Sequence, residues 1–137
     1  FYTSKNDVTL LSERIWRHKL GSDGKSDKMV YHEKDDTFYN GVYRSKSGDY
    51  IIIYNQSTLV SDFHILNADK PDGDFVNFSP REKEHEYSID HYQDKFYIIS
   101  NWDAKNNRLM ETSETKTSKK NWSRQDARIL GCVRSCQ

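Results

Sequence analysis

The stretch HEYSIDH, from His85 to His91, contains the residue types of two kinds of catalytic site. A zinc-protease helix needs His-Glu-x-x-His so that both imidazoles share one helical face, but here the second histidine comes six residues after the first, in a strand-like pattern. Ser88, Asp90 and His91 are the types of a hydrolase triad, yet on a strand His91 points away from the other two. We therefore predict neither a metal site nor a catalytic residue here, and instead expect an inner strand whose polar face borders a wet channel.

Carboxylates gather in two connections and on the strand that follows, and these are the candidates for substrate steering or for contact with another domain: Asp35, Asp36, Glu82, Glu84, Glu86 and Asp90. An acidic rim attracts peptides rich in Lys and Arg through long-range electrostatics. The alternative is that the connections are solvated loops whose charge is offset by Lys34, Arg81 and Lys83, and we favour this second interpretation.

Binding of nucleic acid is not supported by the charge of the chain. Six aromatic residues could stack on bases: Tyr39, Tyr43, Tyr50, Tyr54, Phe96 and Tyr97. A stacking platform needs a basic groove, whereas the 21 basic and 21 acidic residues cancel and the longest basic run, KTSKK, is short. We therefore expect no nucleic-acid partner and interpret the aromatic residues as packing between sheets.

Length and composition predict one domain with many short strands. The 137 residues suffice for one ordinary domain, and the hydrophobic fraction of 34% is low but rich in aromatic residues. No apolar run is long enough to span a membrane, so no membrane partner is expected. Cys132 and Cys136 have neither a zinc-site nor a thioredoxin spacing, and the lack of other cysteines favours a cytoplasmic location. No cofactor is indicated.

A repeat of about 46 residues is the main architectural signal. The stretch Phe38–Asn55 contains two strands around a Ser-Gly-Asp turn, and His85–Asn101 repeats its pattern, with Asn55 aligned to Asn101. Trp16, Phe63 and Leu109 recur at nearly the same offset. A period in the forties that is built from strands is typical of β-propeller blades.

The repeat predicts an all-β fold of antiparallel four-stranded blades, about two and a half of them. The blades cover residues 1–33, 38–79 and 86–112 of a partial propeller at 1–122, followed by an atypical tail at 123–137. The first blade lacks its first strand and the third its fourth. A chain of this kind cannot close a propeller ring, so it is either a segment of a larger propeller or completes its sheets with another copy.

Several long motifs resemble the oligopeptidase B group, also called protease II, of the prolyl oligopeptidase family of serine peptidases. They are RIWRHKLG (14–21), VYHEKDDTFY (30–39), PREKEHEYSIDHY (80–92), KFYIISNWDAKN (95–106) and RLME (108–111). The resemblance covers about residues 1–122 and ends before the tail, where a further outer strand would be expected.

The resemblance implies a seven-bladed propeller that covers a catalytic α/β-hydrolase domain and admits only short peptides, which are cleaved after Lys or Arg. The chain has no Gly-x-Ser-x-Gly motif, which presents the serine in such enzymes, so no catalytic residue is carried over and we expect the chain alone to be inactive. A stand-alone β-rich interaction module that forms homo-oligomers through open sheet edges is the alternative.

Overall fold

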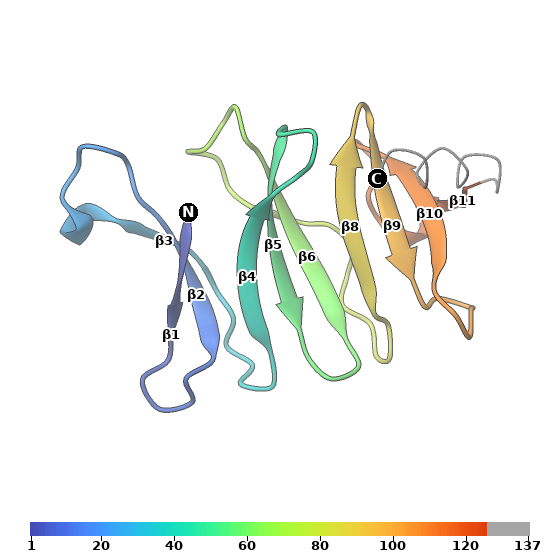
Figure 1. Cartoon of the computed structure of the whole chain (residues 1–137), viewed down its shortest axis with the longest axis horizontal. Coiled ribbons are helices and arrows are strands. Elements are labelled where there is room, and N and C mark those ends of the chain that lie inside the picture. Colours follow the sequence, from blue (N-terminus) through green and yellow to red (C-terminus); the bar gives the residue numbers. More distant parts are fainter. Residues whose placement is uncertain (126–137) are drawn as a thin grey trace.

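The structure, a computed structural model, describes residues 1–125 and contains three antiparallel sheets in chain order (Figure 1). The first sheet consists of β1 (Tyr2–Lys5), β2 (Ser12–Arg17) and β3 (Lys28–His32). The second consists of β4 (Tyr39–Arg44), β5 (Tyr50–Gln56), β6 (Ser61–Asn67) and β7 (Val76–Asn77). The third consists of β8 (Tyr87–Tyr92), β9 (Lys95–Ser100), β10 (Arg108–Ser113) and β11 (Ser123–Arg124). The all-β prediction is therefore confirmed.

Each sheet is a meander, so its strands lie in sequence order and pair with their neighbours along the chain. The three sheets stand in a row in Figure 1, with the second between the other two. Trp16, Phe63 and Leu109, which recur in the sequence, lie on β2, β6 and β10, the strand before the last in each sheet.

The position of the second sheet explains the run Tyr50–Tyr54, which is apolar on both faces. Alternate residues of a strand point to opposite faces, and both Ile52 and Ile53 are fully buried because this sheet has a neighbour on each side. Ile52 belongs to the main apolar cluster, which lies between the second and third sheets and includes Phe63, Ile65, Phe78, Tyr87, Ile89, Phe96, Ile98, Met110 and Trp122.

Two glycines of the second sheet have clear steric roles. Gly41 lies opposite Tyr54, and a Cβ at this position would come within 2.4 Å of the Tyr54 side chain, so only glycine lets the ring lie across β4. Gly48 has φ of +81° in the turn between β4 and β5, a conformation that L side chains rarely adopt.

The expectation that the third sheet lacks a fourth strand was wrong. β11 pairs with β10 through Met110–Arg124 and Glu111–Ser123. A two-residue strand of Ser and Arg has no apolar alternation, so the hydrophobic pattern does not reveal it. The rest of the predicted tail, residues 126–137 with both cysteines, lies outside the described residues.

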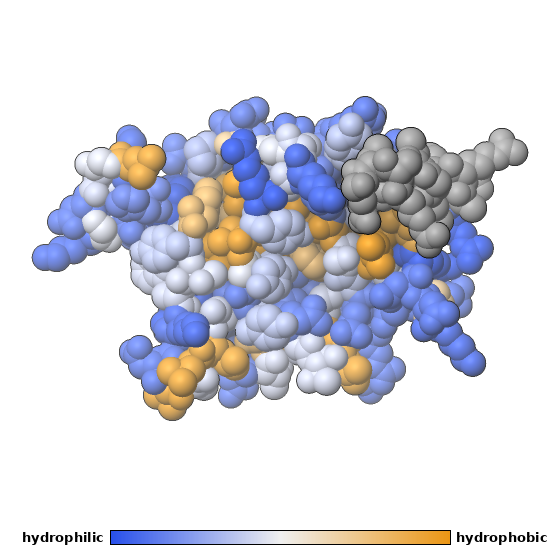
Figure 2. All heavy atoms as spheres, viewed as in Figure 1, coloured by the Kyte–Doolittle hydropathy of each residue, from blue (hydrophilic) through white to orange (hydrophobic). Residues whose placement is uncertain are grey.

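The connections from one sheet to the next lie along one edge of the row. In Figure 1 the segment between β3 and β4 and the start of β8 both lie at the lower edge. The visible face of the protein is largely hydrophilic, with apolar areas that are small and separated (Figure 2). Within residues 1–125 the only helices are two short 3-10 turns, η1 (Gly24–Ser26) and η2 (Lys119–Asn121), and neither could cross a membrane.

Candidate functional site

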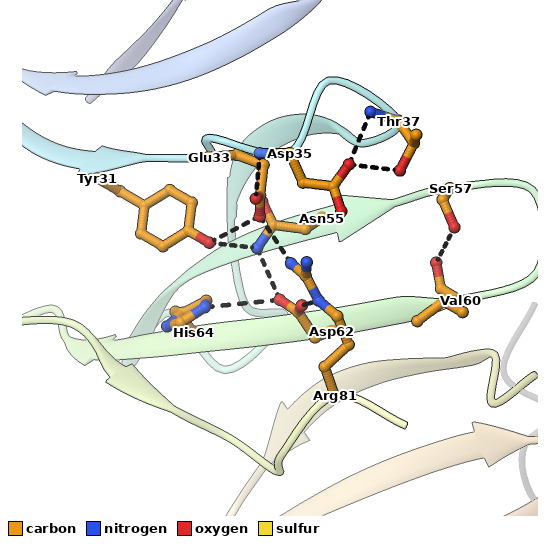
Figure 3. Close-up of polar contacts among 10 residues, drawn as sticks. All are labelled: Tyr31, Glu33, Asp35, Thr37, Asn55, Ser57, Val60, Asp62, His64 and Arg81. Carbon is orange, nitrogen blue, oxygen red and sulfur yellow. Dashed lines mark hydrogen bonds and ion pairs between the residues drawn. The ribbon is translucent and has the colours of Figure 1, made fainter. Parts of the chain in front are cut away.

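A cluster of charged and polar side chains lies where the first and second sheets meet, with Arg81 at its centre (Figure 3). Its carboxylates are buried, whereas a third of the Arg81 side chain is exposed. The Arg81 guanidinium donates to Glu33 Oε2 at 2.6 Å and to Asp62 Oδ2. Glu33 is 7% exposed and Asp62 is 1% exposed, so both carboxylates are nearly removed from water. Buried carboxylates need a counter-charge and hydrogen bonds, and Arg81 supplies both to each of them.

The remaining hydrogen bonds of the cluster come from the two sheets themselves. Asn55 Nδ2 donates to Asp62 Oδ1 at 2.6 Å and to the Tyr31 hydroxyl at 2.8 Å, and that hydroxyl donates to Glu33 Oε2 at 3.2 Å. His64 Nε2 lies 3.5 Å from Asp62 Oδ1. Glu33, Tyr31, Asn55, Asp62, His64 and Arg81 are called the Arg81 cluster below.

The local sequence places these side chains on one interface. Asn55 and Asp62 are paired across β5 and β6 and therefore share a face of the second sheet. Tyr31 of β3 packs on His64 with ring centroids 4.6 Å apart. Arg81 comes from the connection between β7 and β8, and its guanidinium lies 3.8 Å above the centre of the Phe38 ring, a cation–π contact.

Electrostatics favour the ionised form of Asp62. Burial alone would raise the pKa of this carboxyl, but hydrogen bonds from His64, Asn55 and Arg81, with the charge of Arg81, outweigh burial and hold the pKa below its usual value. Burial and the charges of Glu33 and Asp62 raise the pKa of Tyr31, so its hydroxyl stays protonated and can donate. The cluster can thus hold charge, but it contains no activated nucleophile.

The structure brings the connections that carry the predicted acidic residues close together, since Arg81 from one of them binds Glu33 from the other. Asp35 accepts from the backbone and the hydroxyl of Thr37 at 2.9 and 2.6 Å, and these hydrogen bonds lower its pKa. Asp36 is exposed next to it. Both carboxylates therefore lie at the surface beside the Arg81 cluster.

The acidic residues of the second connection have contacts of their own. Glu82 pairs with Lys119 Nζ. Glu86 Oε1 accepts from Gln56 Nε2 at 3.3 Å, and Glu84 is exposed with φ of +56°. The cation that pairs with Glu82 is thus Lys119, and Arg81 pairs with Glu33 and Asp62, which are not among the six candidate carboxylates. Whether these connections steer substrate or are only solvated loops stays a prediction.

Asp90 does not lie with the other five carboxylates. It belongs to the later part of β8, and its Oδ1 accepts from the backbone N–H of Lys46, in the turn between β4 and β5, at 2.9 Å. This turn is at the upper edge of the row in Figure 1, opposite the sheet-to-sheet connections. Asp90 thus ties the second sheet to the third.

His91 has two polar partners, but not those of the hypothetical triad. It is fully buried, and its ring nitrogens lie 2.7 Å from Ser47 Oγ and 2.7 Å from Glu114 Oε1. Ser47, His91 and Glu114 are thus connected by hydrogen bonds, as a nucleophile, base and acid would be in a catalytic triad. The backbone amides that could form an oxyanion hole beside Ser47, however, are already used: Ser47 N donates to His91 O and Gly48 N donates to Ser45 O. These amides are therefore not free to stabilise an oxyanion.

The other candidate sites are also structural or shallow. The His85 ring bonds Ser100 Oγ at 2.9 Å and stacks on Tyr87, away from His91. Among residues 1–125, no three His, Asp or Glu side chains are arranged to hold a metal ion. A shallow cleft of about 460 Å³ lies between the connection that precedes β8 and the loops on either side of β10; it is lined by Ser79, Pro80, Glu82, Trp102, Ser118, Lys119 and Lys120.

The Arg81 cluster is not apparent as a unit in the sequence. Its members come from both sheets and from the connection after them, and Glu33 and Arg81 are 48 positions apart. The recurrence of Asn55 at Asn101 was the one available signal, because an asparagine at the end of a strand in both repeats suggests a role for its amide.

Comparison with protein families gives a match over residues 1–125 to the model described as prolyl oligopeptidase, N-terminal beta-propeller domain. The chain is 40% identical over 123 residues to dipeptidyl aminopeptidase BI of Pseudoxanthomonas mexicana and 34% identical over 110 residues to protease 2 of Moraxella lacunata. These matches cover 89% and 80% of this chain but only 17% and 16% of the relatives. The chain thus spans about a sixth of their length.

Solved structures show the same similarity. Oligopeptidase B from Trypanosoma brucei, with covalently bound antipain, matches with a TM-score of 0.79 and 26% identity over 90% of this chain and 18% of that one. Oligopeptidase B from Leishmania major matches with a TM-score of 0.80 and 24% identity over 89% of this chain and 17% of that one.

Proposed function

The chain belongs to the prolyl oligopeptidase family, within its N-terminal β-propeller domain, and from this we propose that it is a non-catalytic propeller segment of a serine oligopeptidase. In this role it helps to cover a catalytic α/β-hydrolase domain and limits access to short peptides. We assign the whole enzyme to the oligopeptidase B type, which cleaves after Lys or Arg.

The observation that carries this proposal is the continuous match to family members over the described chain. The three sheets match the structure of an oligopeptidase B over 90% of this chain. The sequence of protease 2 is 34% identical to this chain over 110 residues. The 40% identity to dipeptidyl aminopeptidase BI supports a second candidate specificity, the release of dipeptides from free N-termini.

Two peptide substrates separate the two specificities when the whole gene product is assayed. One has a blocked N-terminus and a scissile bond after Arg; the other has a free N-terminus and a scissile bond after its second residue. We expect efficient cleavage of the blocked substrate. Cleavage of the free substrate alone would instead identify a dipeptidyl aminopeptidase.

The 137-residue chain by itself should not hydrolyse either substrate, because its sequence lacks the Gly-x-Ser-x-Gly motif. A serine-directed fluorophosphonate probe should leave it unlabelled. Hydrolysis by the purified chain together with labelling by the probe would contradict the non-catalytic role.

The surface carboxylates Asp35 and Asp36 are the best candidates for steering basic peptides, because the Arg81 cluster does not neutralise them by direct contact. In the whole enzyme, replacing both with Asn should weaken the salt dependence of kcat/KM for a peptide rich in Lys and Arg. A salt dependence equal to that of the unchanged enzyme would remove steering from the proposal.

An interaction module that pairs through its open edges remains the alternative function for the chain alone. β1 is an edge strand of a sheet with only three strands, and an exposed edge can accept another strand. Measurement of the mass in solution distinguishes the two: a monomer is expected for a propeller segment, and a stable dimer would favour edge pairing.

A further inference from the structure

Two buried asparagine side chains lie on the face of the second sheet that meets the first sheet. Asn40 of β4 is 3% exposed and Asn55 of β5 is fully buried. Among the described residues, neither Oδ1 nor Nδ2 of Asn40 has a hydrogen-bond partner, and the same is true of Asn55 Oδ1. Buried amides are rarely left unpaired, because water is lost without replacement.

The register of the sheet brings these two side chains together. Asn40 and Asn55 are directly opposite each other on β4 and β5, so both project from the same face. The backbone of Ser45 donates to Tyr50, which makes 45/50, 43/52 and 41/54 the hydrogen-bonded pairs and leaves 40/55 as a non-hydrogen-bonded pair. Side chains approach each other most closely in pairs of this second kind.

The orientation of the Asn55 amide is fixed by its neighbours. Its Nδ2 donates to the Asp62 carboxylate and to the Tyr31 hydroxyl (Figure 3). Exchange of nitrogen and oxygen would place Oδ1 against a carboxylate oxygen, which is repulsive. Asn55 Oδ1 therefore needs a donor, whereas either orientation of Asn40 offers one donor and one acceptor.

A partner for this site must both accept and donate. A metal cation cannot accept from Asn40 Nδ2, and an anion cannot donate to Asn55 Oδ1. We propose that the Asn40–Asn55 pair binds one or two buried water molecules, which accept from Asn40 Nδ2 and donate to Asn55 Oδ1 and Asn40 Oδ1. Water typically forms about three hydrogen bonds in such sites, and it would extend the Arg81 cluster to β4.

The third sheet provides an internal comparison, because the same two positions recur there 46 residues later as Glu86 and Asn101. Asn101 Oδ1 accepts from the Glu86 backbone at 3.1 Å, and its Nδ2 donates to Glu84 O at 3.2 Å. The protein itself thus satisfies the amide of Asn101, so we expect a water site at Asn55 and none of this kind at Asn101.

The melting temperatures of Asn40→Ser and Asn40→Leu in the full 137-residue chain test the proposal. Serine keeps a hydroxyl and leaves room for water, whereas leucine fills the same space without polar atoms. With bound water, Asn40→Leu should melt about 4 °C below Asn40→Ser. A leucine variant at least as stable as the serine variant would show that the site is dry, and would overturn the proposal.

A crystal structure of the unchanged chain at about 1.5 Å or better gives a second test that needs no variant to fold. Density for a water oxygen within about 3 Å of both Asn40 Nδ2 and Asn55 Oδ1 is expected. Direct hydrogen bonds between the two amides, with no water beside them, would contradict the proposal.

Discussion

The two interfaces between neighbouring sheets are stabilised in different ways. The first, between β1–β3 and β4–β7, contains the Arg81 cluster, whose buried carboxylates are paired with one cation. The second, between β4–β7 and β8–β11, is aromatic: Phe96 packs on Phe78 with ring centroids 5.0 Å apart, and Phe63 packs on Tyr87 at 5.0 Å. One chain can therefore use charge pairing and apolar burial for the same architectural task.

The difference has consequences for how each interface responds to its surroundings. Apolar burial is not directional and depends little on pH. A buried ion pair depends on the ionisation of both partners, and removal of one partner leaves the other uncompensated. The first interface should thus be sensitive to acid and to single charge deletions, and the second to loss of volume.

The largest expected effect is at the aromatic interface. Phe96→Ala removes a fully buried ring and should lower the free energy of unfolding by about 4 kcal/mol. Urea unfolding of the full chain, followed by tryptophan fluorescence, measures this loss. Tyr92→Ala, at a side chain that is 58% exposed, is the control and should cost about 0.5 kcal/mol or less. Equal losses of unfolding free energy in the two variants would contradict the role of aromatic packing in stabilising this interface.

The charged interface should be somewhat less costly to break. Arg81→Met keeps the length of the side chain but leaves Glu33 and Asp62 without their cation, at a cost of about 3 kcal/mol. Lys83→Met, an exposed position in the same connection, is the matched control and should change stability little. If Arg81→Met behaves like this control, the Arg81 cluster does not stabilise the interface.

A smaller effect is expected at the strand between the two interfaces. Gly41→Ala places a methyl group against the Tyr54 ring and should cost about 2 kcal/mol through overpacking. Gly24→Ala is a useful reference because a Cβ at Gly24 meets nothing within 4 Å. Comparable melting temperatures for the two variants would show that Tyr54 moves aside freely.

The smallest effect is the response to acid. The folded-state pKa of Asp62 lies below its unfolded value, so its ionisation stabilises the fold above about pH 4. This contribution is lost as the pH falls through the folded-state pKa. Stability measured between pH 6 and pH 3 should therefore decline less steeply in Asp62→Asn than in the unchanged chain. Parallel curves would assign the acid response to other carboxylates.

The strands could be predicted because their pattern is local. The run YIIIY identifies β5 by itself, and the recurrence of Asn55 at Asn101 gives the repeat of the sheets. β11 could not be found, because the pairing of Ser123 and Arg124 depends on β10 and not on their own hydrophobicity. The sequence pattern thus identifies elements that bury their own side chains, and misses those that form only against a neighbour.

The candidate site was only partly predictable, for a related reason. The sequence predicted Arg81 as a residue that offsets the acidic connections. Its partners are Glu33 and Asp62, however, and Asp62 lies within strand β6, outside both acidic connections. Which acid a given cation binds is decided by the packing of sheets, and this packing is not encoded in sequence spacing.

The position of Arg81 in the chain also has a consequence for folding during synthesis. The first two sheets are complete at Asn77, but the cation that neutralises their interface comes later, 48 residues after Glu33. Both carboxylates are present only from the synthesis of Asp62, and the 19 residues from Asp62 to Arg81 take roughly 1 to 4 s to add at typical translation rates. Until then Glu33 and Asp62 would be buried without a counter-ion, so the two sheets should stay loosely associated on the ribosome and lock together only after Arg81 emerges.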